Sequence, residues 1–153
     1  MSHIIKTNAF KQGIAGEEVV IDFILKNSKE YSFVRKNDNS DFDFILEKNG
    51  EHKTYEVKTD SSIYPNFFIE FESRNKKSSI SVTTADWFCY YFSKKKQLYF
   101  IKTEDLRHLI FSNKFEVKTI TEKNDTDSTK SMNKGFIIPV EEFKRFFKKY
   151  ELS

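Results

Sequence analysis

The chain has 153 residues, enough for one domain with a substantial hydrophobic core, and aromatic residues make up 16% of it, with 17 Phe. Its formal net charge of +3 is mildly basic, which fits a nucleic-acid partner but does not require one. The single Cys89 excludes an intramolecular disulfide and fits a reducing compartment. The longest apolar run, from Trp87 to Phe92, is far too short to span a membrane, so no membrane association is expected.

The first predicted element is a helix from Lys11 to Asn27. Its apolar residues follow one another at steps of three, four or seven, which places them on one stripe: Phe10, Ile14, Ile21 and Ile24. Glu17 lies on the same stripe. A carboxylate on the core-facing side of a helix is unfavourable unless it is paired, hydrogen-bonded or bound to a metal. Glu17 is therefore either an edge residue that pairs with a lysine or a member of a polar site.

A strand from Ser32 to Lys36 is predicted next, followed by a β-hairpin over residues 41–60. The hairpin turns at Asn49-Gly50, a dipeptide that tolerates positive φ. Apolar residues alternate along its first strand, and successive side chains of a strand point to opposite faces of the sheet. The turn and the alternation together predict two antiparallel strands.

The polar residues of this hairpin form a group. Asp43 on the first strand, and Glu56 and Lys58 on the second, fall where two paired strands can bring them together. Two carboxylates and one ammonium group suit a hydrated divalent cation and an anionic substrate. Asp41 shares a face with Asp43 and is an alternative to it, at the mouth of the strand.

Beyond the hairpin, residues 66–72 alternate as a strand, and residues 88–102 are predicted to form a second hairpin, rich in strand formers. Glu70 is expected to face solvent, unless its strand borders the strand of Glu56. Residues 73–79 form a polar loop without periodicity. This loop and the turn of the second hairpin carry two basic clusters suited to DNA phosphates: Arg74, Lys76, Lys77, Lys94, Lys95 and Lys96.

The C-terminal third is predicted as a helix over 103–112 that Thr103 caps, two short strands over 115–121 and 135–140, and a final helix. Residues 121–134 hold one Met and no other large apolar residue, which predicts a mobile segment. The final helix is predicted over 141–150, because aromatic residues recur there at helical spacing: Phe143, Phe146, Phe147 and Tyr150.

The hairpin resembles the core of the PD-(D/E)XK nucleases, the restriction-endonuclease-like family. Asp43 stands at the place of the motif Asp, after Phe42 instead of Pro, and Glu56-Val57-Lys58 stands at the place of the (D/E)XK element. The twelve residues between Asp43 and Glu56 are a spacing similar to that of archaeal-type Holliday junction resolvases. The run from Gly13 to Glu17 resembles the G-x-x-x-E start of the first helix in resolvase-like members, where the Glu reaches the metal site. Thr83-Thr-Ala-Asp-Trp87 resembles a segment of small phage-type members.

The resemblance implies an α/β fold, with a central mixed β-sheet flanked by helices in the order αβββαβ, and a single nuclease-like domain over residues 1–153. It implies a DNA endonuclease that uses Mg²⁺, or Mn²⁺ as a substitute, and leaves a 5′-phosphate and a 3′-hydroxyl. Asp43, Glu56 and the Val57 carbonyl would hold the metal. Lys58 would position the attacking water or offset charge on the phosphate, and Glu17 would complete the shell or hold a second ion.

The resemblance leaves the substrate and the setting open. The chain carries no obvious recognition domain, so the shape of a junction or flap, or a partner, would select the DNA. Resolvase-like members dimerise, which implies a homodimer through an exposed hairpin or the final helix. A bacterial cytoplasm or a phage-infected cell is the expected location. The alternatives are a non-catalytic DNA-binding or assembly protein that keeps the fold, and an accessory protein without a nucleic-acid role.

Overall fold

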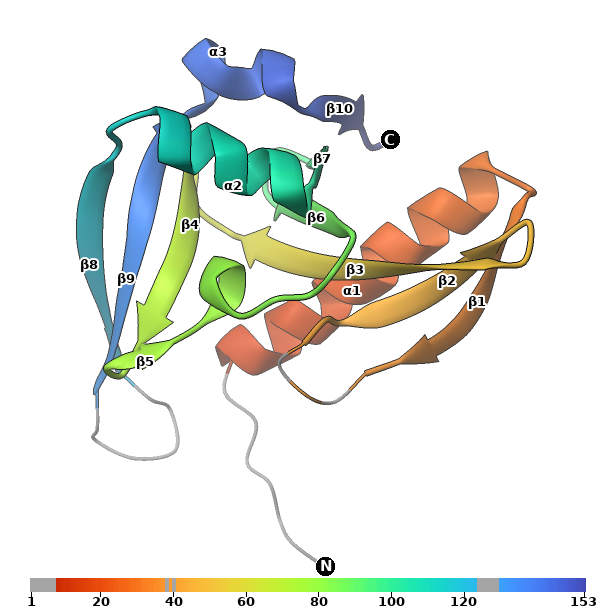
Figure 1. The fold of residues 1–153 in the computed structure, drawn as a ribbon, viewed down its shortest axis with the longest axis horizontal. Coiled ribbons are helices and arrows are strands. Elements are labelled where there is room, and N and C mark those ends of the chain that lie inside the picture. Colours follow the sequence, from red (N-terminus) through yellow and green to blue (C-terminus); the bar gives the residue numbers. More distant parts are fainter. Residues whose placement is uncertain (1–7, 38, 40, 124–129) are drawn as a thin grey trace, which may run out of the picture.

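Two β-sheets and one long helix dominate the structure (Figure 1), a computed structural model that describes residues 8–37, 39, 41–123 and 130–153. The larger sheet has six strands in the order β1-β2-β3-β6-β7-β10, and the smaller has four in the order β5-β4-β9-β8. The elements in chain order are α1 (Asn8–Asn27), β1 (Tyr31–Lys36), β2 (Phe44–Lys48), β3 (Glu51–Asp60), β4 (Asn66–Ser73), β5 (Lys76–Lys77), the 3₁₀ turn η1 (Ser79–Ser81), β6 (Trp87–Phe92), β7 (Gln97–Lys102), α2 (Thr103–Ser112), β8 (Glu116–Lys123), β9 (Lys130–Pro139), α3 (Val140–Phe143), the 3₁₀ turn η2 (Lys144–Phe146) and β10 (Lys148–Glu151).

The N-terminal third follows the sequence prediction closely. The helix is present and begins at Asn8, three residues earlier than predicted. Its residues Val20, Ile21 and Ile24 are buried against the larger sheet, whereas the side chain of Phe10, also assigned to the stripe, lies outside the described residues. Strands β2 and β3 form the predicted hairpin, with positive φ at both turn residues. Local signals were sufficient here because each strand pairs with its sequence neighbour.

Both faces of the larger sheet are buried at β6 and β7, whose side chains point alternately to the two faces. The side chains on one face pack with α1, and those on the other face pack with α2 and the inner face of the smaller sheet. The α1 side contains Cys89, Leu98 and Phe100, and the opposite side contains Phe88, Tyr90, Phe92, Tyr99 and Ile101. The molecule is thus layered as helix, sheet, then helix with second sheet (Figure 1).

The element order departs from αβββαβ after the third strand. Strands β3 and β6 are parallel neighbours, so the larger sheet is mixed as expected. In the described structure the connection between them contains β4, β5 and η1 instead of an α-helix. A parallel pair needs a long crossover, and here that crossover supplies strands to a second sheet.

The second sheet overturns two sequence predictions. Lys76 and Lys77 form β5, paired with β4 through a tight turn with positive φ at Arg74 and Asn75, so residues 73–79 are not a plain loop. Of the segment 121–134, residues 121–123 and 130–134 lie in the paired strands β8 and β9, while 124–129 lie outside the described residues. Both regions lack apolar periodicity, and their strands are set by pairing with distant partners.

The predicted C-terminal helix is wrong. Only residues 140–143 are α-helical, and β10 pairs with β7 instead, so β10 becomes the edge strand of the larger sheet. Phe147 stacks on Phe67 with ring centroids 4.5 Å apart. The final helix therefore cannot serve as a dimer surface. Thr103 begins α2 as predicted but does not cap it, because its buried Oγ1 has no hydrogen-bond partner in the described structure.

Candidate active site

The pairing of β2 with β3 ends next to Asp43, and the candidate site is built on that break. The Asp43 N–H donates to Tyr55 O over 2.7 Å, and the Val57 N–H donates to Asp43 Oδ2 over 2.7 Å. The Asp43 carboxylate thus continues the hydrogen-bond ladder where the backbone of β2 has ended. In the described register, β3 runs on to Asp60 paired with β6 alone, which leaves an open strand edge beside Asp43.

Glu56 and Asp43 line one hollow of about 220 Å³ at this edge. The buried Thr83 Oγ1 lies 3.2 Å from Glu56 Oε1 and 2.9 Å from Asp41 O. A hydroxyl has one proton, so Thr83 donates to one of these oxygens at a time. Asp41, the alternative to Asp43, has an exposed side chain and meets the site only through its backbone carbonyl.

Glu17 approaches from α1, which packs on the face of β3 opposite to Glu56. Gly16 permits this approach, because a Cβ at that position would overlap the hydroxyl of Thr59 in β3. Gly13, the other glycine of the resolvase-like run, has open space where its Cβ would be. The fold therefore needs glycine at position 16, and its own packing does not need one at position 13.

The surroundings disfavour the charged form of all three carboxyl groups. Burial raises the pKa of Glu56 from 4.5 to about 8 and that of Glu17 from 4.5 to about 7, and the charge of Asp43 adds to both shifts. Burial also raises the pKa of Asp43, against the hydrogen bond from Val57 and the charge of Lys36. Lys36, which pairs with Glu18, is the cation that partly offsets this group, and sequence reasoning missed it.

Lys58 and Glu70 line the same hollow. The Lys58 Nζ lies 5.9 Å from the centroid of the Phe68 ring, so it leans towards β4. Glu70 reaches the hollow from β4 and accepts a hydrogen bond from Ser78 Oγ over 2.7 Å. The expectation that Glu70 faces solvent is wrong, and its strand enters from the second sheet without bordering β3.

Within the described part of the chain, no three His, Cys, Asp or Glu side chains are grouped tightly enough to hold a metal ion by themselves. Mg²⁺ does not require such a group, since it keeps several waters and is usually bound by one or two carboxylates and substrate phosphates. Asp43 and Glu56 fit that description, because both line the same hollow and the charge of Asp43 disfavours ionisation of Glu56. Glu17 lies close enough to interact electrostatically with both, but it does not complete a closed shell.

The two basic clusters lie at opposite ends of β4, roughly 20–25 Å apart at about 3.3 Å per residue. Arg74, Lys76 and Lys77 surround the β4–β5 turn. Lys94, Lys95 and Lys96 form the β6–β7 turn, next to the loop that joins β3 to β4, where the Lys95 Nζ donates to Tyr64 O over 3.2 Å. The structure therefore does not bring the two clusters together.

Two contacts that support the site could not be read from the sequence. At the surface, Asp86 accepts hydrogen bonds from the Thr54 N–H over 2.9 Å and from its hydroxyl over 3.1 Å, which ties the segment that resembles phage-type members to β3. The Tyr90 hydroxyl donates to Asp60 Oδ2 over 2.6 Å and accepts from the Phe68 N–H over 2.9 Å. This link joins the end of the site strand to the second sheet.

Comparisons with known proteins add little. No protein-family model matches the sequence, and no curated protein matches it. A solved structure with a partly similar backbone is that of a bacterial homing endonuclease, I-Ssp6803I, which is 15% identical, with 67% of this chain and 68% of that chain covered and a TM-score of 0.48. The geometry and chemistry of the site itself are therefore the basis for the function. In the described structure, no helix is long and apolar enough to cross a membrane.

Proposed function

We propose that this chain is a divalent-metal-dependent nuclease that hydrolyses phosphodiester bonds in DNA. One observation carries the proposal: Asp43 and Glu56 line one hollow at an open strand edge, Glu17 of α1 interacts electrostatically with both, and burial raises the pKa of each. Buried carboxylates are stable when ionised only if a cation compensates them. The sequence resemblance to PD-(D/E)XK nucleases supports the same assignment.

Asp43 and Glu56 would hold a Mg²⁺ or Mn²⁺ ion, with the Val57 carbonyl as a further oxygen donor. A divalent ion in such a site supplies Lewis-acid chemistry towards a phosphate oxygen. Lys58 lines the same hollow and would offset the charge that develops on the phosphate during attack by water. Glu17 would act as a positioning residue, whose charge strengthens the attraction of the site for the cation.

The test is DNA cleavage by purified protein with Mg²⁺, with Mn²⁺ and with EDTA, on duplex, single-stranded, flap and four-way-junction DNA. We expect wild type to cleave only with a divalent ion, and Asp43→Asn and Glu56→Gln to lose cleavage while remaining folded by circular dichroism. Glu116→Gln is the matched control, because its side chain is exposed on β8. Metal-dependent cleavage at the wild-type rate by either site variant would contradict the assignment.

Isothermal titration calorimetry with Mg²⁺ separates this function from the alternatives. A nuclease site should bind the ion in wild type and lose most of that binding in Glu56→Gln. A protein that binds DNA in EDTA, shows no heat with the ion and cleaves none of the four DNA structures would be a non-catalytic DNA-binding protein that keeps the fold.

A further inference from the structure

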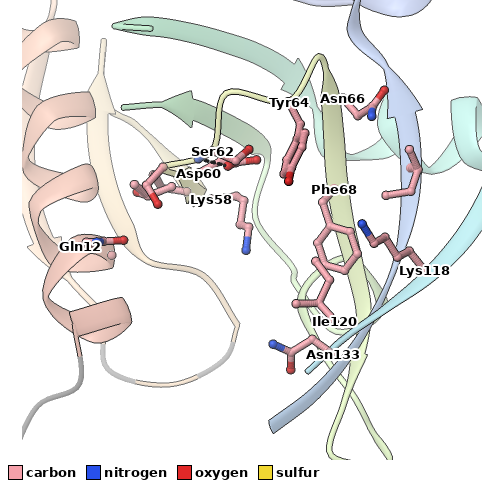
Figure 2. Close-up of a pocket in the computed structure, with 15 residues that line it drawn as sticks. Gln12, Lys58, Asp60, Ser62, Tyr64, Asn66, Phe68, Lys118, Ile120 and Asn133 are labelled. Atoms are coloured by element: carbon pink, nitrogen blue, oxygen red, sulfur yellow. Dashed lines mark hydrogen bonds between the residues drawn. The ribbon is translucent and has the colours of Figure 1, made fainter. Parts of the chain in front are cut away.

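A second, larger cleft of about 530 Å³ lies next to the candidate active site. It shares Val57 and Lys58 with the smaller hollow, so the two spaces adjoin along β3. Figure 2 shows Gln12 of α1 on one side, and Tyr64, Phe68 and Lys118 on the other. The cleft thus lies between the first helix and the outer face of the second sheet.

The wall formed by the second sheet combines apolar and basic side chains. Phe68 and Ile137 contribute flat apolar surface from neighbouring strands, and Tyr64 stands at the rim, 67% exposed. The Lys118 Nζ lies 6.0 Å from the centroid of the Tyr64 ring, and Lys95 is bonded to the backbone of the same residue. An exposed aromatic ring with one lysine beside the ring and a second at its backbone suits a base flanked by phosphates.

The charge of the cleft also favours an anionic chain. Lys58 and Lys118 are its two cations, and Asp60 is the one carboxylate among the described residues that line it. Both Asp60 oxygens are engaged, since Oδ2 accepts from the Tyr90 hydroxyl and Oδ1 accepts from the Ser62 N–H over 2.8 Å. The two lysines therefore give the cleft a net positive charge, and one of them, Lys58, also lines the catalytic hollow.

The helix wall is unusually open at Gly13. A glycine inside a helix costs about 1 kcal/mol relative to alanine, yet apart from the adjacent helix backbone and its two chain neighbours, no described atom lies within 4 Å of the position of its Cβ. The fold therefore gains nothing from the missing side chain. Gly13 lines the cleft, where it leaves the helix backbone open to close approach by a bound chain.

We propose that this cleft binds one unpaired strand of DNA, with a base on Tyr64 and phosphates at Lys118 and Lys58, and that it delivers that strand to the catalytic hollow. This inference rests on the proposed nuclease function and names its substrate class: DNA with a single-stranded arm, such as a flap or fork. A space of about 530 Å³ is in the range of small-molecule pockets, about 300–1,000 Å³. It accommodates nucleotides of one strand.

The test measures binding of the full chain to fluorescein-labelled DNA by anisotropy in EDTA, with a fork that has unpaired arms and a blunt duplex of the same sequence. Tyr64→Ala should weaken binding to the fork about tenfold or more, the loss expected when one stacking ring is removed, and Tyr64→Phe should restore it. Lys118→Gln should reduce the slope of log affinity against log salt by about 0.7, the value for one lost single-strand phosphate contact. Phe111→Ala and Lys29→Gln, exposed and away from the cleft, are the matched controls.

The expected result is tighter binding to the fork than to the duplex, with a loss confined to the variants of the cleft. Equal binding of fork and duplex by wild type, or equal effects of Tyr64→Ala and Phe111→Ala, would overturn the inference. If the protein gives one of these two results but still cleaves duplex DNA with Mg²⁺, the proposed nuclease function is retained and the proposed strand-binding role of the cleft is wrong. If no metal-dependent cleavage and no DNA binding are found, both are wrong.

Discussion

Removing the charge of Glu56 should stabilise the metal-free protein, increasingly so at high pH. Burial, and then the neighbouring Asp43, raise the pKa of Glu56 from 4.5 to about 8. A group whose folded pKa is raised contributes stability that is present below its unfolded pKa and lost as pH rises to the folded one, here between about pH 4.5 and pH 8. At 1.36 kcal/mol per pKa unit, the loss has an upper limit of about 5 kcal/mol.

Glu56→Gln cannot ionise, and its amide oxygen can still accept from Thr83. We expect its free energy of unfolding to be within about 1 kcal/mol of wild type near pH 5, and about 2–4 kcal/mol higher near pH 9. The lower figure applies if water enters the hollow and solvates the carboxylate.

Urea unfolding in EDTA, followed by the fluorescence of the single Trp87, measures both values. Glu116→Gln, on the exposed surface of β8, should show no such pH dependence. A difference between wild type and Glu56→Gln that stays flat from about pH 5 to about pH 9, or a variant less stable at the higher pH, would refute the view that Glu56 is buried among like charges.

Two further predictions concern α1. Gly16→Ala should lower the free energy of unfolding by about 1–3 kcal/mol, because its methyl group would overlap Thr59 and push the helix away from β3. Gly13→Ala has open space at that position and should raise the free energy of unfolding by up to about 1 kcal/mol. Equal effects of the two substitutions in urea melts would contradict the close approach of α1 to β3. Glu17→Gln should lose most cleavage activity and, in EDTA, be as stable as wild type or more so. Mg²⁺ should raise the melting temperature of this variant less than that of wild type. Full activity with the same Mg²⁺-induced rise in melting temperature as wild type would make Glu17 an ordinary helix residue.

The sequence by itself determined those elements whose partners are near in the chain. The Asn49-Gly50 turn and the alternation around it specified the β2–β3 hairpin, and the aromatic run of residues 88–92 specified β6. Helical spacing in 11–27 specified α1. The hairpin and α1 each have one buried face that repeats with the period of the element, and β6 is a short apolar run buried on both faces, so each signal is local.

Long-range pairing decided the rest of the fold. Residues 143–150 carry a helical pattern, but the free edge of β7 and the stacking of Phe147 on Phe67 favour a strand that ends the sheet. The second sheet joins β4 to β9 across a wide sequence separation, and β5 and much of β8 have no apolar periodicity of their own. A strand held mainly by backbone bonds to a distant partner leaves little trace in its own sequence.

The candidate site divides in the same way. Strand alternation placed Asp43, Glu56 and Lys58 together from the sequence, because two paired strands have a fixed register. Only the tertiary structure showed that Gly16 lets Glu17 reach them, since that depends on the distance between α1 and β3. The same is true of Lys36, Glu70 and the cleft beside Tyr64, whose residues meet through the packing of two sheets and one helix, and sequence spacing carries no record of that packing.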